Sequence, residues 1–132
     1  MTETINHPRH YQHASGIECW QLSAYMPHPL ASALEYVWRY EAKNGVEDLK
    51  KARWWLQCWL DNPDIPRVSQ KGKFLAAVSQ VEQVETDEAR GALIYDICAA
   101  ADTTMARKSK AISTVKSAVR LLDILIERLS ND

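Results

Sequence analysis

The chain has 132 residues, of which 46% are hydrophobic and 25% are charged, and its formal net charge is -1. This composition is typical of one ordinary globular domain, because a disordered chain would have fewer apolar residues and more net charge. The near-neutral charge gives no reason to expect general nucleic-acid binding, and no apolar run is long enough to cross a membrane.

The N-terminal segment, residues 1–16, is polar and irregular in sequence, because Pro8 and Gly16 interrupt any continuous helix. The apolar residues at 17–25 predict a short first helix, which ends before Pro27. The opening residues contain no apolar h-region, so we expect no secretory signal.

A helical hairpin is predicted next. Helical spacing of apolar residues indicates helices at 30–43 and 47–60, and Pro29 fits the first turn of the first of them. Asn44 and Gly45 predict a cap and turn between these helices. Because the connection is so short, the two helices should lie antiparallel.

The C-terminal half begins after a loop at residues 61–68, and residues 69–132 are again helical in pattern. Three helices are predicted there, at Ser69–Val84, at Asp87–Arg107 with Thr86 as its N-cap, and at Ser109–Leu129. One long bent helix over residues 92–130 is the alternative. The sequence therefore predicts an all-α fold, a compact helical bundle that forms a single domain over residues 1–132.

The last predicted helix carries an apolar seam at spacings of three and four. Its residues are Ile112, Val115, Val119, Leu122, Ile126 and Leu129. Such a seam needs a partner helix, either within the chain or from a second subunit. We expect a homo-oligomer that forms through the C-terminal helices.

Two residue types have unusual positions. All five tryptophans fall in the first 59 residues, which favours core packing, with an aromatic interface or stacking platform as the alternative. The three cysteines, Cys19, Cys58 and Cys98, are far apart and form no C-x-x-C pair. They indicate free buried thiols in a reducing, cytoplasmic setting.

Histidine spacing raises the question of a metal site. His7, His10 and His13 are three residues apart, as zinc ligands can be. Pro8 prevents a simple helical array, however, and no cysteine or carboxylate completes a known metal spacing. Hydrogen bonding within an ordered N-terminal loop is the favoured interpretation, and no metal site is predicted.

Carboxylates offer a second alternative. Glu82 and Glu85 form an E-x-x-E pair of the kind that holds magnesium in all-helical nucleotide pyrophosphohydrolases. The next helix offers only Asp96 and Asp102, which are six residues apart and lie on different faces. This enzyme class is therefore a minor alternative.

The sequence contains no Walker A loop, no G-x-G-x-x-G motif and no G-x-S-x-G motif. Any phosphate site would need arginine and lysine side chains or helix N-termini. The predicted hairpin supplies Arg39, Lys43 and Lys51, interleaved with carboxylates. A solvated, salt-bridged face is one interpretation of these charges, and a phosphate site at Arg39 and Lys51 is the other.

Two blocks of sequence carry a family resemblance. They are Asn6-His7-Pro8-x-His10-Tyr11 followed by Gly16-Ile17-Glu18, and Tyr36-x-x-Arg39, Lys43 and Glu47-Asp48-Leu49-Lys50-Lys51-Ala52-x-Trp54. Over residues 5–60 the chain resembles a family of small phage-encoded proteins that includes a coliphage deoxynucleoside monophosphate kinase. Glu35 stands where this family usually has a lysine, and Ala31-Ser32 replaces its Gly-Asn.

The resemblance implies a phage or prophage protein that binds nucleotides, with kinase-like phosphotransfer and ATP as its candidate cofactor. It suggests nucleotide or phosphate ligands at Asn6, His7, His10, Tyr11, Arg39, Lys43, Asp48 and Lys51, and it assigns no catalytic residue. The alternative is a non-enzymatic phage protein that binds and inhibits a host component, such as part of a defence system. Either protein would act in the cytoplasm of an infected or lysogenic bacterium.

Overall fold

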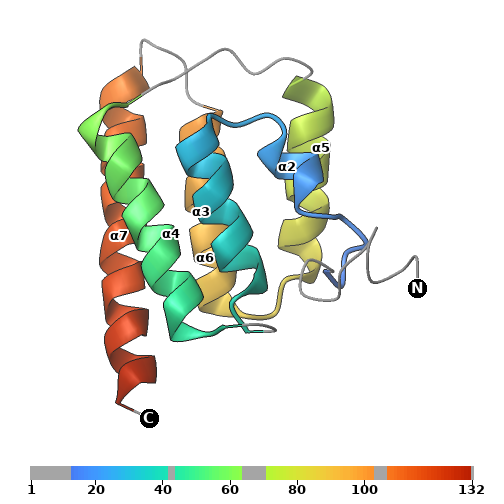
Figure 1. Ribbon diagram of the computed structural model, residues 1–132. Coiled ribbons are helices and arrows are strands. Elements are labelled where there is room, and N and C mark those ends of the chain that lie inside the picture. The colour runs from blue at the N-terminus through green and yellow to red at the C-terminus, as the bar shows by residue number, and fades with distance from the viewer. Residues whose placement is uncertain (1–12, 42–43, 64–70, 103–106, 132) are drawn as a thin grey trace.

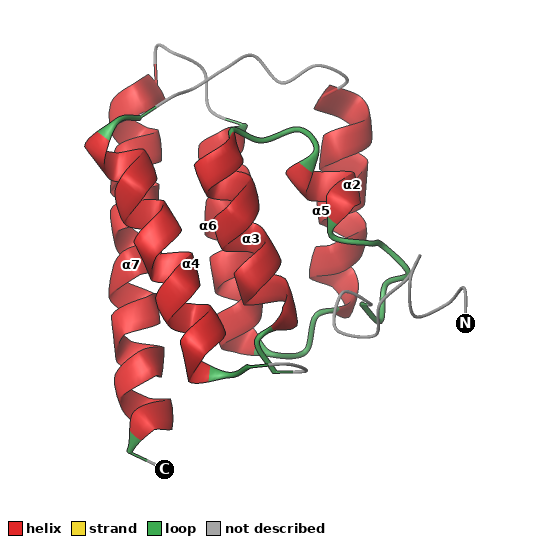
Figure 2. Cartoon of the chain, in the orientation of Figure 1, coloured by secondary structure: helices red, strands yellow, loops and turns green. Residues whose placement is uncertain are grey.

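The computed structural model describes residues 13–41, 44–63, 71–102 and 107–131, and within these ranges the chain forms six helices and no strand (Figure 2). The helices are α2 (Trp20–Ser23), α3 (His28–Arg39), α4 (Val46–Asp61), α5 (Lys71–Val84), α6 (Glu88–Ala101) and α7 (Lys108–Ser130). The predicted all-α bundle is confirmed.

The bundle has two layers of long helices. Helices α3 and α4 pack against each other as the predicted hairpin and lie in front of α6 and α7 (Figure 1). Contacts between α3 and α6, and between α4 and α7, join the layers. Helices α2 and α5 pack together at one side of the bundle.

Helix boundaries in the first half differ from the prediction in two places. Helix α2 covers only Trp20–Ser23, because the backbone tightens into turns at Tyr25 and Met26, which donate to Leu22 and Ser23. Helix α3 begins at His28, since Pro29 fits its first turn, and it ends at Arg39 rather than Lys43. Lys43 lies outside the described residues.

Helix α6 also differs from the prediction at both ends. Its N-cap is Asp87, whose carboxylate accepts a hydrogen bond from the Arg90 backbone N–H at 2.9 Å, and Thr86 has no capping role. The helix ends at Ala101 instead of Arg107, because the backbone of Asp102 departs from helical dihedral angles. Because α7 begins at Lys108, residues 92–130 do not form one continuous helix.

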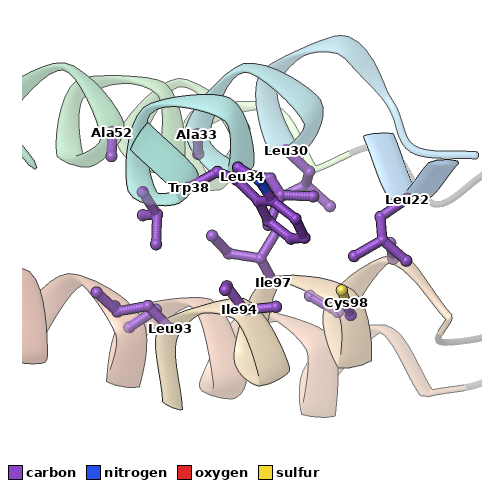
Figure 3. Close-up of a cluster of buried hydrophobic side chains, with 14 of the residues drawn as sticks. Leu22, Leu30, Ala33, Leu34, Trp38, Ala52, Leu93, Ile94, Ile97 and Cys98 are labelled. Carbon is purple, nitrogen blue, oxygen red and sulfur yellow. The ribbon is translucent and has the colours of Figure 1, made fainter. Parts of the chain in front are cut away.

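The core lies between the two layers. Figure 3 shows Leu30, Leu34 and Trp38 of α3 facing Ile94 and Ile97 of α6, and all five side chains are at most 2% exposed. Burial of each such leucine or isoleucine stabilises the fold by about 1.5–3 kcal/mol. A smaller group, Leu22 of α2 and Phe74 of α5, joins the same core from the side.

The apolar seam of α7 packs within the chain, against α4 and α6. Val115 and Leu122 are buried, Ile112 and Ile126 are half-buried, and Leu129 is 36% exposed. Ala111, Val119 and Leu125 are buried with them, as is Ala118. The homo-oligomer stays a prediction, and a contact through α7 would have to use exposed side chains such as Ile124 and Leu129.

The tryptophan cluster is only partly core. Trp38 and Trp59 are buried and Trp55 is half-buried, but Trp20 and Trp54 are 63% and 60% exposed. All three cysteines are free, with Cys58 half-buried and the other two buried. Burial raises the pKa of the Cys19 and Cys98 thiols, which keeps them protonated and removes them as nucleophiles.

Candidate functional site

The α3–α4 hairpin brings together the described residues of the predicted phosphate site. Antiparallel packing places Arg39 beside Asp48 at one end, Tyr36 beside Lys51 in the middle, and His28 beside Trp55 at the other end. We call this set of six residues the hairpin site. Gly45 allows the chain to turn between the two helices. Its φ of +55° lies in the left-handed region, which glycine adopts without the steric cost that a Cβ atom brings.

Two cations converge on one aromatic ring at the centre of the hairpin site. The Arg39 guanidinium lies 4.7 Å from the centroid of the Tyr36 ring, and the Lys51 ammonium lies 5.5 Å from the same point. Both distances are within the range of cation–π attraction. Lys51 is exposed, and among the described residues no carboxylate forms an ion pair with it.

Asp48 is a positioning residue rather than an accessible ligand. Its side chain is fully buried, and its two oxygens accept from Arg39 Nη2 at 3.3 Å and from the Asn44 backbone N–H at 3.2 Å. A buried carboxylate with these donors holds the guanidinium in place. It also ties the turn at Asn44 to the start of α4.

The other end of the hairpin site is aromatic. The Trp55 ring lies 5.0 Å from His28 and 4.9 Å from Trp54, nearly perpendicular to both. Trp54 is largely exposed, so its ring and that of Trp55 form an open corner at the surface. A planar ligand can stack on one ring of such a corner while its edge meets the other.

Glu35 lies beside this site and lowers its positive charge. Burial raises the pKa of the Glu35 carboxyl above its usual range, against the opposing effect of His28 and Arg39. The residue therefore gains a proton more readily than an exposed glutamate as the pH falls. This side chain marks the departure from the lysine of the phage family.

Five of the predicted ligand residues lie outside the described residues. They are Asn6, His7, His10, Tyr11 and Lys43. Of the three histidines that suggested zinc, only His13 lies in the described part of the chain. No group of three metal-ligating side chains occurs among the described residues.

His13 belongs to a polar network that the sequence patterns did not predict. Both the Ser15 backbone N–H and the Ser15 hydroxyl point to His13 Nδ1, at 3.0 and 2.8 Å, so this nitrogen accepts. The opposite nitrogen, Nε2, then carries the proton and donates to Glu85 at 3.1 Å. The side chains of His13 and Glu85 are only 3% and 4% exposed.

Arg90 completes this network. It donates to both oxygens of Glu85, at 2.7 and 3.0 Å, in a bidentate pair. Burial alone would raise the pKa of Glu85, but the hydrogen bonds from Arg90 lower it below its usual range. An added Cβ at Gly91 would lie 3.2 Å from Glu85 Cγ, so the missing side chain gives the carboxylate its space. We call His13, Glu85 and Arg90 the buried triad.

Tyr40 and Asp87 extend the triad towards the hairpin. The Tyr40 hydroxyl donates to Asp87 Oδ2 at 2.9 Å, and burial together with this hydrogen bond raises the pKa of Tyr40. Every charged group here has a partner, so the network acts as a structural connection between the N-terminal loop, α3 and α6. The only sequence signal for it was the expected hydrogen bonding of the N-terminal loop.

The magnesium alternative finds no support in the arrangement of carboxylates. Glu85 is already paired with Arg90 and His13, which leaves Glu82 alone. Burial raises the pKa of Asp96, so this group binds a cation less readily than an exposed aspartate. Among the described residues, no three carboxylates lie close enough together to hold a metal ion.

A groove runs along the surface between α5 and α6. Two adjoining hollows of about 320 and 230 Å³ form it, and both are lined by Glu82 and Tyr95. Phe74, Leu75 and Val78 contribute from α5 at one end, where they face Cys98 and Ala99 of α6. We call this feature the α5–α6 groove.

Comparison with known proteins gives one match. Residues 5–57 match the profile of a family described as a protein of unknown function (DUF3310). This range includes α2, α3 and most of α4, and so all six residues of the hairpin site. The description names no activity, so the resemblance to phage nucleotide kinases stays a prediction.

No curated protein and no solved structure has significant similarity to the chain. Among the described residues, no helix has the length and apolar character needed to cross a membrane.

Proposed function

We propose that the hairpin site binds a nucleotide, as part of a phage or prophage accessory protein with kinase-like phosphotransfer. The observation that carries this proposal is the convergence of Arg39 and Lys51 on the Tyr36 ring. Both cations lie against one ring, so a phosphate group bound at its edge would interact favourably with the charge of each. Asp48 restrains only the arginine, so the exposed lysine supplies the more available charge.

The aromatic end of the hairpin site predicts how a nucleotide would be oriented when it binds. Lys51 and Trp55 are one helical turn apart on α4, which corresponds to about 6 Å along the axis. A nucleoside monophosphate with its phosphate at Lys51 can therefore place its base against Trp55. Stacking of a base on an aromatic ring contributes about 1–3 kcal/mol.

In a phosphotransfer reaction Arg39 and Lys51 would stabilise negative charge on the transferred group, with ATP as the donor. Asp48 is too deeply buried and too well paired to orient the acceptor. The described residues thus support binding and charge stabilisation, and the catalytic base is left unassigned.

A thermal-shift screen against ATP and each nucleoside and deoxynucleoside monophosphate tests this proposal. A ligand at a hundred times its dissociation constant stabilises a protein by about 2.7 kcal/mol, or several degrees in a domain of this size. We expect Lys51→Ala to weaken nucleotide binding about tenfold. The control is Lys50→Ala, which removes an exposed lysine that pairs with Glu47. No shift with any nucleotide, or an equal loss in both variants, would overturn the proposal.

A second experiment tests whether the base of the bound nucleotide contacts Trp55. Trp55→Leu should weaken nucleotide binding about tenfold while leaving inorganic pyrophosphate binding unchanged. Trp20→Leu is the control, because Trp20 is exposed on α2. Equal loss of both ligands in Trp55→Leu would show that this residue does not contact the base.

A second candidate function is binding and inhibition of a host protein. The α5–α6 groove favours it, because Leu75 and Tyr95 are exposed along this groove, and adjoining apolar surface in a groove is a common site of protein binding. This function would use a surface on α5 and α6, separate from the hairpin site.

A further inference from the structure

The α5–α6 groove combines apolar surface with charge of one sign. Leu75 and Tyr95 are exposed along it by 42% and 55%. The charged residues that line its two hollows are all carboxylates: Glu82, Glu85, Asp87, Glu88 and Asp102. No lysine or arginine of the described chain lines either hollow.

Two of these carboxylates remain available to a partner. Glu85 is held by Arg90, and Asp87 accepts from Tyr40 and caps α6. Glu82 and Glu88 are exposed, and neither has an ion-pair partner among the described residues. The groove therefore presents free negative charge beside apolar side chains.

We propose that the α5–α6 groove binds a basic amphipathic helix of a partner protein. Apolar residues on one face of the partner helix would pack on Leu75 and Tyr95, and lysine or arginine at its edges would pair with Glu82 and Glu88. This is the helix-in-groove mode of recognition. The inference rests on the second proposed function and is independent of nucleotide binding at the hairpin.

Charge also decides against a second copy of the chain as the occupant. Symmetric self-association through the groove would bring Glu82 and Glu88 of one copy close to the same residues of the other, and like charges so placed are unfavourable. The length of the groove sets the size of the partner. Its lining residues run from Glu88 at the start of α6 to Asp102, which caps the end of this helix, about 21 Å along the axis, and this length matches a partner helix of about 14 residues.

The test uses a fluorescein-labelled peptide of leucine and lysine, about 14 residues long, whose leucines lie on one helical face. A second peptide of the same composition, rearranged so that it has no apolar face, controls for charge alone. Fluorescence anisotropy measures the affinity of the full chain for each. We expect binding of the first peptide, weakened at least about tenfold by Glu82→Lys and by Tyr95→Ala.

Two variants on α7 match these changes away from the groove. Glu127→Lys makes the same charge change, and Ile124→Ala truncates an exposed apolar side chain. Both should bind the peptide as the unaltered chain does, and circular dichroism checks that all four variants are folded. Equal weakening by Glu127→Lys, or equal binding of the two peptides, would reduce the effect to bulk charge and overturn the inference.

A capture experiment, in which the chain retains proteins from a host lysate, tests two statements separately: that the chain binds a host protein, and that the α5–α6 groove is the site of this binding. A host protein retained equally by the unaltered chain and by Glu82→Lys would keep the binding function and remove the groove as its site. Absence of peptide binding together with a clean capture experiment would reject both.

Discussion

Glu85 is a nearly buried carboxylate that joins the start of α6 to the N-terminal loop. Its carboxylate accepts hydrogen bonds from Arg90, which is five residues away in sequence, and from His13, which is 72 residues away. Sequence patterns gave no sign of this contact, because Glu85 and Arg90 resemble the charges of any exposed helix start. A pair of residues so far apart is set by tertiary packing alone.

The first prediction concerns this pair. Glu85→Ala or Arg90→Ala should each lower the free energy of unfolding by about 3 kcal/mol, since each leaves a buried charge without its partner. The double variant should lose much less than the sum of the two, which urea denaturation can measure as a double-mutant cycle. Additive losses would mean that the two side chains act independently. The exposed pair Glu47–Lys50 is the control, with an expected effect below about 1 kcal/mol.

The second prediction is the pH dependence that Glu85 produces. Its pKa is lower in the folded chain than its ordinary value of 4.5, because hydrogen bonds from Arg90, the Asp87 backbone N–H and His13 outweigh burial. The unfolded state therefore gains the proton first as the pH falls, so this stability is complete above pH 4.5 and is lost as the pH falls through the folded-state pKa. The free energy of unfolding of Glu85→Gln, measured by urea denaturation, should fall less steeply than that of the unaltered chain as the pH is lowered below 4.5. Some decrease should remain in the variant, because the pKa of Asp87 is also lowered in the folded chain.

At the scale of elements, α6 begins where a side chain caps it. Thr86 and Asp87 are both good N-cap residues by type, so the sequence alone could not choose between them. The structure selects Asp87, because its carboxylate reaches both the Arg90 N–H and the Tyr40 hydroxyl. Tertiary contact with α3 thus decides the boundary of α6.

The third prediction follows from this cap. Asp87→Ala should lower the free energy of unfolding by about 1–2 kcal/mol, and Thr86→Ala should change it by less than about 0.5 kcal/mol. Chemical denaturation followed by circular dichroism measures both. A larger loss in Thr86→Ala than in Asp87→Ala would place the cap one residue earlier.

The hairpin was predictable in more detail than the rest of the bundle. A short connection at Asn44 and Gly45 requires antiparallel helices, so Arg39 and Lys51 were expected on neighbouring helices, but their shared contact with the Tyr36 ring was not predicted. The aromatic end was not predictable, because five clustered tryptophans do not reveal which rings face solvent. The end of α6 at Ala101 was missed because its wide apolar stripe, which packs against α3, α5 and α7, hides the helical period.

At the scale of the whole molecule, the two halves of the chain share one core. Helix α3 and most of α4 lie in the family-matched residues 5–57, and these two helices pack on α6 and α7. Leu34 of α3 and Ile97 of α6 are both fully buried and lie across the interface from each other (Figure 3). Removal of either half would expose the apolar face of the other, so the hairpin site depends on helices outside the family match.

The fourth prediction tests this dependence. A fragment of residues 1–63 should show no cooperative thermal unfolding by circular dichroism, because its hairpin leaves Leu34, Leu49 and Leu56 without the helices that bury them. Addition of a second fragment, residues 64–132, should restore a cooperative transition if both halves are needed for one core. Cooperative unfolding of the first fragment alone would instead make the family-matched region an independent domain. The hairpin site would then need nothing from α6 and α7, and its ligand binding could be measured in isolation.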